Sequence, residues 1–142
     1  MVLAALTAAL SASTAFAGDL TVFSTSDVHG SVIGWNYFKA QPADVGLAKV
    51  STIINEARAQ KGKDDAILCI DGGDILQGTP LDTYMVQHPH EWKAGEHPMF
   101  AAYNKIGYDA IELGNHEFNF GLDYLRKAIG KNKNVLGANV ID

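Results

Sequence analysis

The sequence predicts an α/β fold, and three observations support this class. Short hydrophobic runs of strand length recur along the chain, and amphipathic segments with helical spacing separate them. A polar cluster follows directly after each of the first three hydrophobic runs. Strands that alternate with helices are typical of βαβ units, so we expect a sheet whose strands are largely parallel.

Size and composition indicate one globular domain. The chain has 142 residues, of which 47% are hydrophobic and 19% charged, a balance typical of folded rather than disordered proteins. Its net charge of −5 argues against binding of a nucleic acid polymer, which normally requires a basic face. Small anionic substrates remain compatible with this charge if metal ions supply local positive charge.

Residues 1–17 predict a secretory signal peptide. The segment Val2–Leu10 is almost wholly apolar, and Ala15-Phe16-Ala17 closes it with a small-x-small pattern. This pattern is typical of a signal cleaved after Ala17, and the apolar run is too short to span a membrane. We therefore expect an exported protein that is periplasmic, secreted or associated with the cell wall. No Lys or Arg precedes the apolar run, so a start upstream of Met1 stays open, as does a buried helix in place of a signal.

The first half of the remaining chain predicts two strands and one helix. Leu20–Ser24 is rich in β-branched and aromatic residues, as strands are. Apolar residues at helical spacing over Val45–Gln60, closed by Lys61-Gly62-Lys63, predict an amphipathic helix. Ala66–Ile70 is a second apolar strand. Its Cys69 is the only cysteine, so no intrachain disulfide can form and a buried core role is expected.

The second half continues the alternation of strands and helices. We expect a helix over His97–Ile106 that begins at His97, and a third strand over Asp109–Leu113. A further helix is expected over Gly121–Ile129, and Val135–Leu136 starts a fourth strand. The stretch Leu81–Glu96 is rich in His, Pro and Trp and predicts an irregular loop.

The three polar clusters are expected to meet at one edge of the sheet. They are Asp27-Val28-His29, Gly72-Gly73-Asp74 and Gly114-Asn115-His116-Glu117. In an open parallel sheet, functional groups collect where loops leave the carboxyl ends of the strands. We therefore expect five of these side chains at that edge, namely Asp27, His29, Asp74, Asn115 and His116.

These side chains indicate a site for two divalent cations. Oxygen and imidazole ligands such as Asp27 and His29 suit zinc, manganese, iron or cobalt better than calcium. Asp74 follows two glycines, which free its carboxylate to bridge two ions, and Asn115 offers a neutral oxygen. Two ions about 3.5–4 Å apart can clamp a phosphoryl group, and His116 can face the substrate as an acid or charge stabiliser. Each motif alone could also be a surface cluster, a turn or a helix cap.

The clusters together resemble the calcineurin-like metallophosphoesterases. Gly73–Leu81 and Gly114–Leu122, with His97-Pro98 and Gly107-Tyr108-Asp109, resemble the exported 5′-nucleotidase group within that family. Inside this group they look most like the bifunctional 2′,3′-cyclic-nucleotide 2′-phosphodiesterase/3′-nucleotidases. The resemblance extends over essentially all of residues 20–142.

This resemblance implies a fold and a domain organisation. The fold is a layered α/β/β/α sandwich with largely parallel strands, of which residues 18–142 would be the N-terminal part. The C-terminal nucleotide-binding domain of such enzymes, and the later Gly-His-x-His segment that completes their metal site, are not found in this sequence.

The resemblance also implies roles for single residues. Asp27 and His29 would bind the first ion, Asp74 would bridge both, and Asn115 would bind the second. His116 would stabilise the transition state, and no residue is assigned to any other cofactor.

The implied activity is the hydrolysis of nucleotides, with 2′,3′-cyclic phosphodiesters and 3′-monoesters as substrates. Asn119 stands where the 5′-nucleotidase branch typically has Asp, which favours the cyclic phosphodiesterase branch. A 5′-nucleotidase or UDP-sugar hydrolase is the enzymatic alternative, and a non-catalytic remnant with an incomplete metal site is the other. Four ligands divided between two ions leave both underfilled, so this chain alone is expected to be inactive. The sequence does not indicate an oligomeric state.

Two further groups of residues are weaker candidates. His88 and His90 have the spacing of a ligand pair, but they lie in a Pro-flanked stretch without a preceding strand, so solvated loop residues are expected. Trp35, Tyr37 and Phe38 could stack on a nucleobase, although aromatics beside a glycine-rich loop more often pack onto their own domain.

Overall fold

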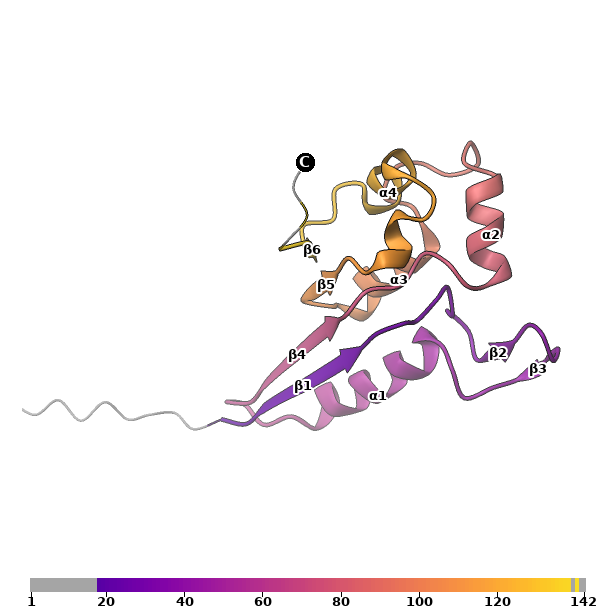
Figure 1. Ribbon diagram of the computed structural model, residues 1–142. Coiled ribbons are helices and arrows are strands. Elements are labelled where there is room, and N and C mark those ends of the chain that lie inside the picture. Colours follow the sequence, from indigo (N-terminus) through magenta and orange to yellow (C-terminus); the bar gives the residue numbers. More distant parts are fainter. Residues whose placement is uncertain (1–17, 139, 141–142) are drawn as a thin grey trace, which may run out of the picture.

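The computed structural model describes residues 18–138 and residue 140, and it confirms the α/β class. The predicted signal peptide at residues 1–17 lies outside the described residues. A four-stranded sheet in the order β1-β4-β5-β6 forms the centre, and each neighbouring pair of strands is parallel (Figure 1). The strand bounds are Leu20–Thr25 for β1, Ala66–Asp71 for β4, Ala110–Glu112 for β5 and Val135–Leu136 for β6.

Helices connect these strands where the hydrophobic spacing predicted them. α1 covers Leu47–Gln60 between β1 and β4, and α3 covers Pro98–Ile106 before β5. α4 covers Leu122–Ile129 between β5 and β6, and a 3-10 turn, η1, precedes it at Asn115–Phe118. Among the helices of residues 18–140, none has both the length and the hydrophobicity that a membrane crossing requires.

One helix, α2 at Pro80–Gln87, was not predicted from the sequence. The prediction of an irregular loop over Leu81–Glu96 is therefore wrong in its first part. Thr79 and Asp82 form a capping box at the start of α2, in which the Thr79 N–H donates to Asp82 Oδ2 at 3.1 Å. Pro80 lies in the first turn, where its fixed φ and missing N–H favour a helix start instead of a break.

A short antiparallel hairpin occupies the loop after β1. Its strands are β2 at Trp35–Asn36 and β3 at Gln41–Pro42. The Asn36 side-chain oxygen accepts hydrogen bonds from the backbone N–H groups of Phe38 and Lys39, at 3.0 Å each, and so closes the turn. Figure 1 shows the hairpin and α2 at the same end of the molecule, beyond the carboxyl ends of β1 and β4.

The hydrophobic core lies on one face of the sheet. Side chains of α1 and α3 pack there against the inward-facing strand residues, and the group includes Phe23, Leu47, Ile54, Cys69, Phe100, Tyr103 and Ile111. Cys69 is fully buried, which confirms its expected core role. Arg58 of α1 donates to the backbone oxygens of Ile106 and Gly107, so α1 also satisfies the carboxyl end of α3.

The opposite face of the sheet is apolar and exposed within the described part of the chain. Val22 and Leu68 are neighbours in the β1–β4 register and are 49% and 36% exposed. Leu20 and Leu136 are 64% and 53% exposed. A parallel sheet normally has both faces covered, so an open apolar face agrees with the predicted half of a layered sandwich.

Candidate metal centre

The loops that follow β1, β4 and β5 meet at the carboxyl edge of the sheet, as predicted. Backbone hydrogen bonds join the first two, from Asp27 N–H to Gly73 O at 2.9 Å and from His29 N–H to Asp74 O at 3.0 Å. The second and third loops approach even more closely. A Cβ on Gly73 would lie 2.3 Å from the Gly114 nitrogen, so only glycine fits there.

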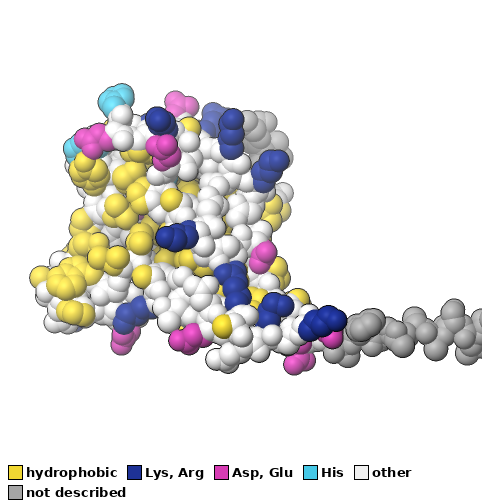
Figure 2. Space-filling view, turned by 180° about the vertical axis from the view of Figure 1, so that it is seen from behind, with side chains coloured by type: hydrophobic (Ala, Val, Ile, Leu, Met, Phe, Trp, Pro, Cys, Tyr) yellow, Lys and Arg dark blue, Asp and Glu magenta, His cyan; other side chains and the backbone are white. Residues whose placement is uncertain are grey.

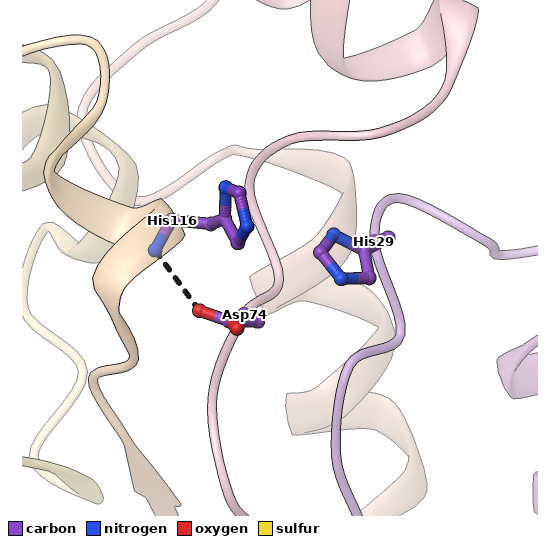
Figure 3. A group of neighbouring side chains, drawn as sticks. All are labelled: His29, Asp74 and His116. Carbon is purple, nitrogen blue, oxygen red and sulfur yellow. Dashed lines mark hydrogen bonds between the residues drawn. The ribbon is translucent and has the colours of Figure 1, made fainter.

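Three of the predicted side chains form one cluster. Ligand atoms of His29, Asp74 and His116 all lie within 4.8 Å of one another, and all three residues are half-buried. Figure 3 shows them extending toward one another from three separate segments, with the His116 N–H donating to Asp74 Oδ1 at 2.9 Å. The two imidazole rings meet edge to face, with 5.0 Å between their centroids.

The other two predicted ligands lie beside this cluster. Asp27 Oδ1 is 3.8 Å from His29 Nε2, and the Asp27 side chain is 64% exposed. Asn115 is the exposed first residue of η1 and directly precedes His116. The structure therefore brings four of the five side chains together, and it places Asn115 next to His116 in the same loop, where it is exposed.

Backbone strain is concentrated at the same edge. Among the described residues, the non-glycine positions with positive φ are Asp27 at 53°, His29 at 46°, Asp74 at 62° and Ala40. A left-handed conformation costs an L-residue about 1–2 kcal/mol, and such strain collects at functional sites. Three of these four residues are predicted metal ligands, so the local fold holds them in a conformation that their own preferences oppose.

Glu117 holds the Asp74 turn in place, a role the sequence analysis missed. Its buried carboxylate accepts four backbone hydrogen bonds, from the N–H groups of Asp74 (2.8 Å), Ile75 (2.5 Å), Leu76 (3.1 Å) and Gly114 (2.7 Å). Glu117 thus ties the loop after β4 to the loop after β5. The only signal in the sequence was an acid in the first turn after Gly-Asn-His, which is also a common helix-start pattern.

His29 is oriented by a hydrogen bond behind the ring. Its Nδ1 lies 2.6 Å from the backbone oxygen of Gln77. A carbonyl oxygen can only accept, so Nδ1 carries a proton, and in the neutral ring Nε2 then keeps its lone pair. Metal-binding histidines typically have this arrangement, in which the second ring nitrogen donates to a carbonyl or carboxylate.

A buried carboxylate lies behind the first loop. Asp82 is 1% exposed, and a Cβ on Gly30 would lie 2.0 Å from its Oδ2, so Gly30 leaves room for this acid next to His29. Burial raises the pKa of Asp82 to about 6, which the hydrogen bonds from Thr79 only partly oppose.

The aromatic residues of the hairpin do not pack as expected. Phe38 is 92% exposed, and Trp35 and Tyr37 are 36% and 39% exposed. Together with His29 they line a hollow beside the cluster. Figure 2 shows hydrophobic side chains gathered at the end of the molecule where the hairpin lies.

The remaining histidines are not part of the cluster of His29, Asp74 and His116. His97 precedes α3 and caps it, since its Nδ1 accepts the Met99 N–H at 3.3 Å, which confirms that it begins the helix. His97 Nε2 lies 3.0 Å from the Tyr124 hydroxyl. His88 stacks on Tyr84 at the end of α2, and His90 is exposed.

The buried His97 predicts a loss of stability in mild acid. Burial lowers its pKa from 6.5 to about 4. Between these two pH values His97 is therefore neutral in the folded chain and protonated in the unfolded chain. The contribution of His97 to stability should be complete above about pH 6.5 and fall by about 3 kcal/mol as the pH approaches 4, whereas the raised pKa of Asp82 acts in the opposite direction below about pH 6. Urea unfolding from pH 7.5 to 4 isolates the His97 contribution as the difference between the wild type and His97→Asn, which keeps a capping side chain and should lose less stability in acid. An equally steep slope in that variant would contradict the assignment.

Comparison with known proteins gives clear relatives, although no protein-family model matches the chain. It is 41% identical over 139 residues to a 2′,3′-cyclic-nucleotide 2′-phosphodiesterase/3′-nucleotidase of Yersinia enterocolitica, covering 94% of this chain and 21% of the relative. It is 36% identical to the trifunctional nucleotide phosphoesterase YfkN of Bacillus subtilis (85% and 8%) and 35% identical to a 5′-nucleotidase of Vibrio vulnificus (87% and 20%). The chain therefore spans about a fifth or less of the length of these relatives.

Solved structures agree with these relatives. The calcineurin-like phosphoesterase YfkN of Bacillus subtilis superposes with a TM-score of 0.70 at 33% identity, over 84% of this chain and 36% of that one. A Staphylococcus aureus structure described as a 5′-nucleotidase in complex with α-ketoglutarate gives 0.65 at 34% identity, over 77% and 20%.

Fold, site and similarity together define the class. The chain belongs to the calcineurin-like phosphoesterases, which confirms the resemblance seen in its motifs. Within that class its relatives include the bifunctional cyclic-nucleotide phosphodiesterase/3′-nucleotidases and the 5′-nucleotidases. Enzymes of this class use divalent metal ions, and the cluster of His29, Asp74 and His116 marks the candidate site for such ions.

Proposed function

We propose that residues 18–142 are the N-terminal, metal-binding part of an exported phosphoesterase that hydrolyses nucleotides. The observation that carries the proposal is the convergence of His29, Asp74 and His116, whose ligand atoms lie within 4.8 Å although they come from three separate loops. The favoured substrates are 2′,3′-cyclic phosphodiesters and 3′-monoesters, and the base-binding domain would lie in another part of the protein.

The donor set fits divalent metal ions. Asp27 and His29 would hold the first ion, Asp74 would be shared, and Asn115 would contribute to the second. Imidazole with carboxylate and amide oxygens suits zinc, manganese, iron or cobalt. The contact of His29 Nδ1 with a backbone oxygen supports this assignment, because in the neutral ring it leaves Nε2 with the lone pair that a metal ligand must offer. When bound, two such ions stabilise the negative charge that develops on a phosphoryl group.

His116 would act on the substrate. Its backbone is fixed by the hydrogen bond from its N–H to Asp74, so the ring remains beside the proposed metal ligands. From there an imidazole can stabilise developing charge or donate a proton to the leaving oxygen. Asn119 Nδ2 lies 2.8 Å from His116 Nδ1, so the neighbour of this ring is an amide and not a carboxylate. This supports the cyclic phosphodiesterase branch over the 5′-nucleotidase branch.

Calorimetric titration with Mn²⁺ tests the proposal. Binding of two ions would support a working two-metal centre, and one ion would support the incomplete remnant. Absence of binding would overturn the assignment of a metal centre to this chain. With Mn²⁺ present, comparing hydrolysis of 2′,3′-cyclic AMP with hydrolysis of 5′-AMP by the longer protein then identifies the branch.

A further inference from the structure

Gln77 lies between the two histidines of the cluster and contacts both. Its backbone oxygen is 2.6 Å from His29 Nδ1, and its side-chain Oε1 is 2.5 Å from His116 Nδ1. The two imidazole rings that carry these nitrogens have their centroids 5.0 Å apart. One residue therefore supplies a hydrogen-bond partner to each imidazole, once from its main chain and once from its side chain.

Both contacts are made by oxygen atoms that can only accept. A proton must therefore lie on Nδ1 of each ring, and in the neutral ring Nε2 then keeps its lone pair. Asn119 Nδ2 donates to the same Gln77 Oε1, so its 2.8 Å approach to the protonated His116 Nδ1 is a contact between two donors that share one acceptor and not a hydrogen bond. An amide oxygen has two lone pairs, so it can accept from His116 and Asn119 together.

We propose that Gln77 is a positioning residue shared by both histidines, which fixes each ring with its proton on Nδ1. The inference rests on the proposed function, since it assigns the ring state of a proposed metal ligand and of the proposed catalytic histidine. Partners of this kind are as important to a metal site as its ligands, because they select the tautomer and hold the ring. Here two neutral amides, Gln77 and Asn119, occupy the position behind His116.

A single substitution can separate the two contacts, because the backbone of Gln77 makes one and its side chain makes the other. A substitution at residue 77 keeps the backbone oxygen in place as long as the loop retains its conformation. The side-chain oxygen, in contrast, is lost in Gln77→Leu. This variant should release His116 and leave His29 unchanged. Gln77→Glu keeps an acceptor oxygen at the same distance from the backbone and should restore the state of His116. Gln77 is half-buried at the rim of a hollow, so both side chains can be accommodated.

The experiment is long-range ¹H–¹⁵N NMR of the imidazole rings in the labelled, metal-free chain, at about pH 8, where free imidazole is neutral. The expected result is an Nδ1–H pattern for both rings in the wild type. In Gln77→Leu, His116 should lose that single pattern while His29 keeps it, and Gln77→Glu should restore it. An Nε2–H pattern for wild-type His116 would overturn the proposal, as would a Gln77→Leu variant that changes neither ring or both alike.

Two internal controls distinguish a failure of this proposal from a failure of the proposed function. The His97 signal, from a buried ring far from Gln77 in the sequence, reports whether each variant is folded. A parallel Mn²⁺ titration reports the metal site. Correct tautomers without Mn²⁺ binding would refute the metal centre and leave the Gln77 assignment standing. Mn²⁺ binding with the wrong His116 tautomer would refute the Gln77 assignment alone.

Discussion

Replacing Glu117 by Gln is expected to lower the free energy of unfolding by about 2–5 kcal/mol. One carboxylate oxygen accepts from Ile75 and Leu76, and the other accepts from Asp74 and Gly114. An amide can replace only one of these oxygens, because its NH₂ group would face two N–H donors. Each buried donor left without a partner costs about 1–3 kcal/mol, and the charge assistance of the remaining bonds is lost as well.

Urea denaturation measures this effect, with Glu112→Gln as the matched control. Glu112 is an exposed acid at the end of β5, five residues before Glu117, so its replacement should change stability by less than about 0.5 kcal/mol. Equal stabilities of the two variants would show that Glu117 does not hold the loops together. Folded Glu117→Gln should also bind Mn²⁺ more weakly, because the Asp74 turn is then less firmly fixed.

Most of the fold could be predicted because it is encoded by local hydrophobic periodicity. Runs such as Leu20–Thr25 and the helical spacing of Leu47–Gln60 each bury one face against the same core. The parallel order of the strands then determines that the loops after β1, β4 and β5 meet at one edge. No tertiary information was needed for that conclusion.

The elements that were missed depend on context that periodicity does not contain. The stretch Leu81–Glu96 was predicted as a loop from its composition, yet Thr79, Pro80 and Asp82 form the start of α2. The hairpin strands are two residues long, which is too short for any alternation to appear.

Within the site, the candidate ligands could be predicted from residue type, whereas the residues that hold them in position could not. Glu117 accepts from N–H groups more than forty residues earlier in the chain, and Gln77 reaches His116 across a similar separation. Backbone N–H and C=O groups carry no sequence signature, so a side chain that binds them in a distant loop cannot be recognised before the fold is known. This is why residue type predicts candidate ligands but not the residues that hold them in position.

Replacing Asp74 by Asn is expected to weaken Mn²⁺ binding by at least about 100-fold, since losing a mere outer-shell partner already costs about 10–100-fold. The substitution is close to isosteric, and Asn tolerates the left-handed φ of 62° at this position. The Oδ1 of the new Asn can still accept the hydrogen bond from the His116 N–H, which in the wild type lies 2.9 Å from Asp74 Oδ1. The variant therefore loses charge and bridging capacity with little cost to the fold.

Calorimetry with three variants makes this result specific. Asp64→Asn, at an exposed acid in the turn before β4, removes the same charge and should bind Mn²⁺ like the wild type. His116→Ala should change the affinity by less than about threefold, because His116 is proposed to act on substrate and not on metal. If His116→Ala instead loses as much affinity as Asp74→Asn, His116 is a ligand, and the cluster with His29 then forms a single-ion site. If Asp74→Asn keeps full affinity, the shared carboxylate at the centre of the proposed site is wrong, and no two-metal mechanism can be built on this edge of the sheet.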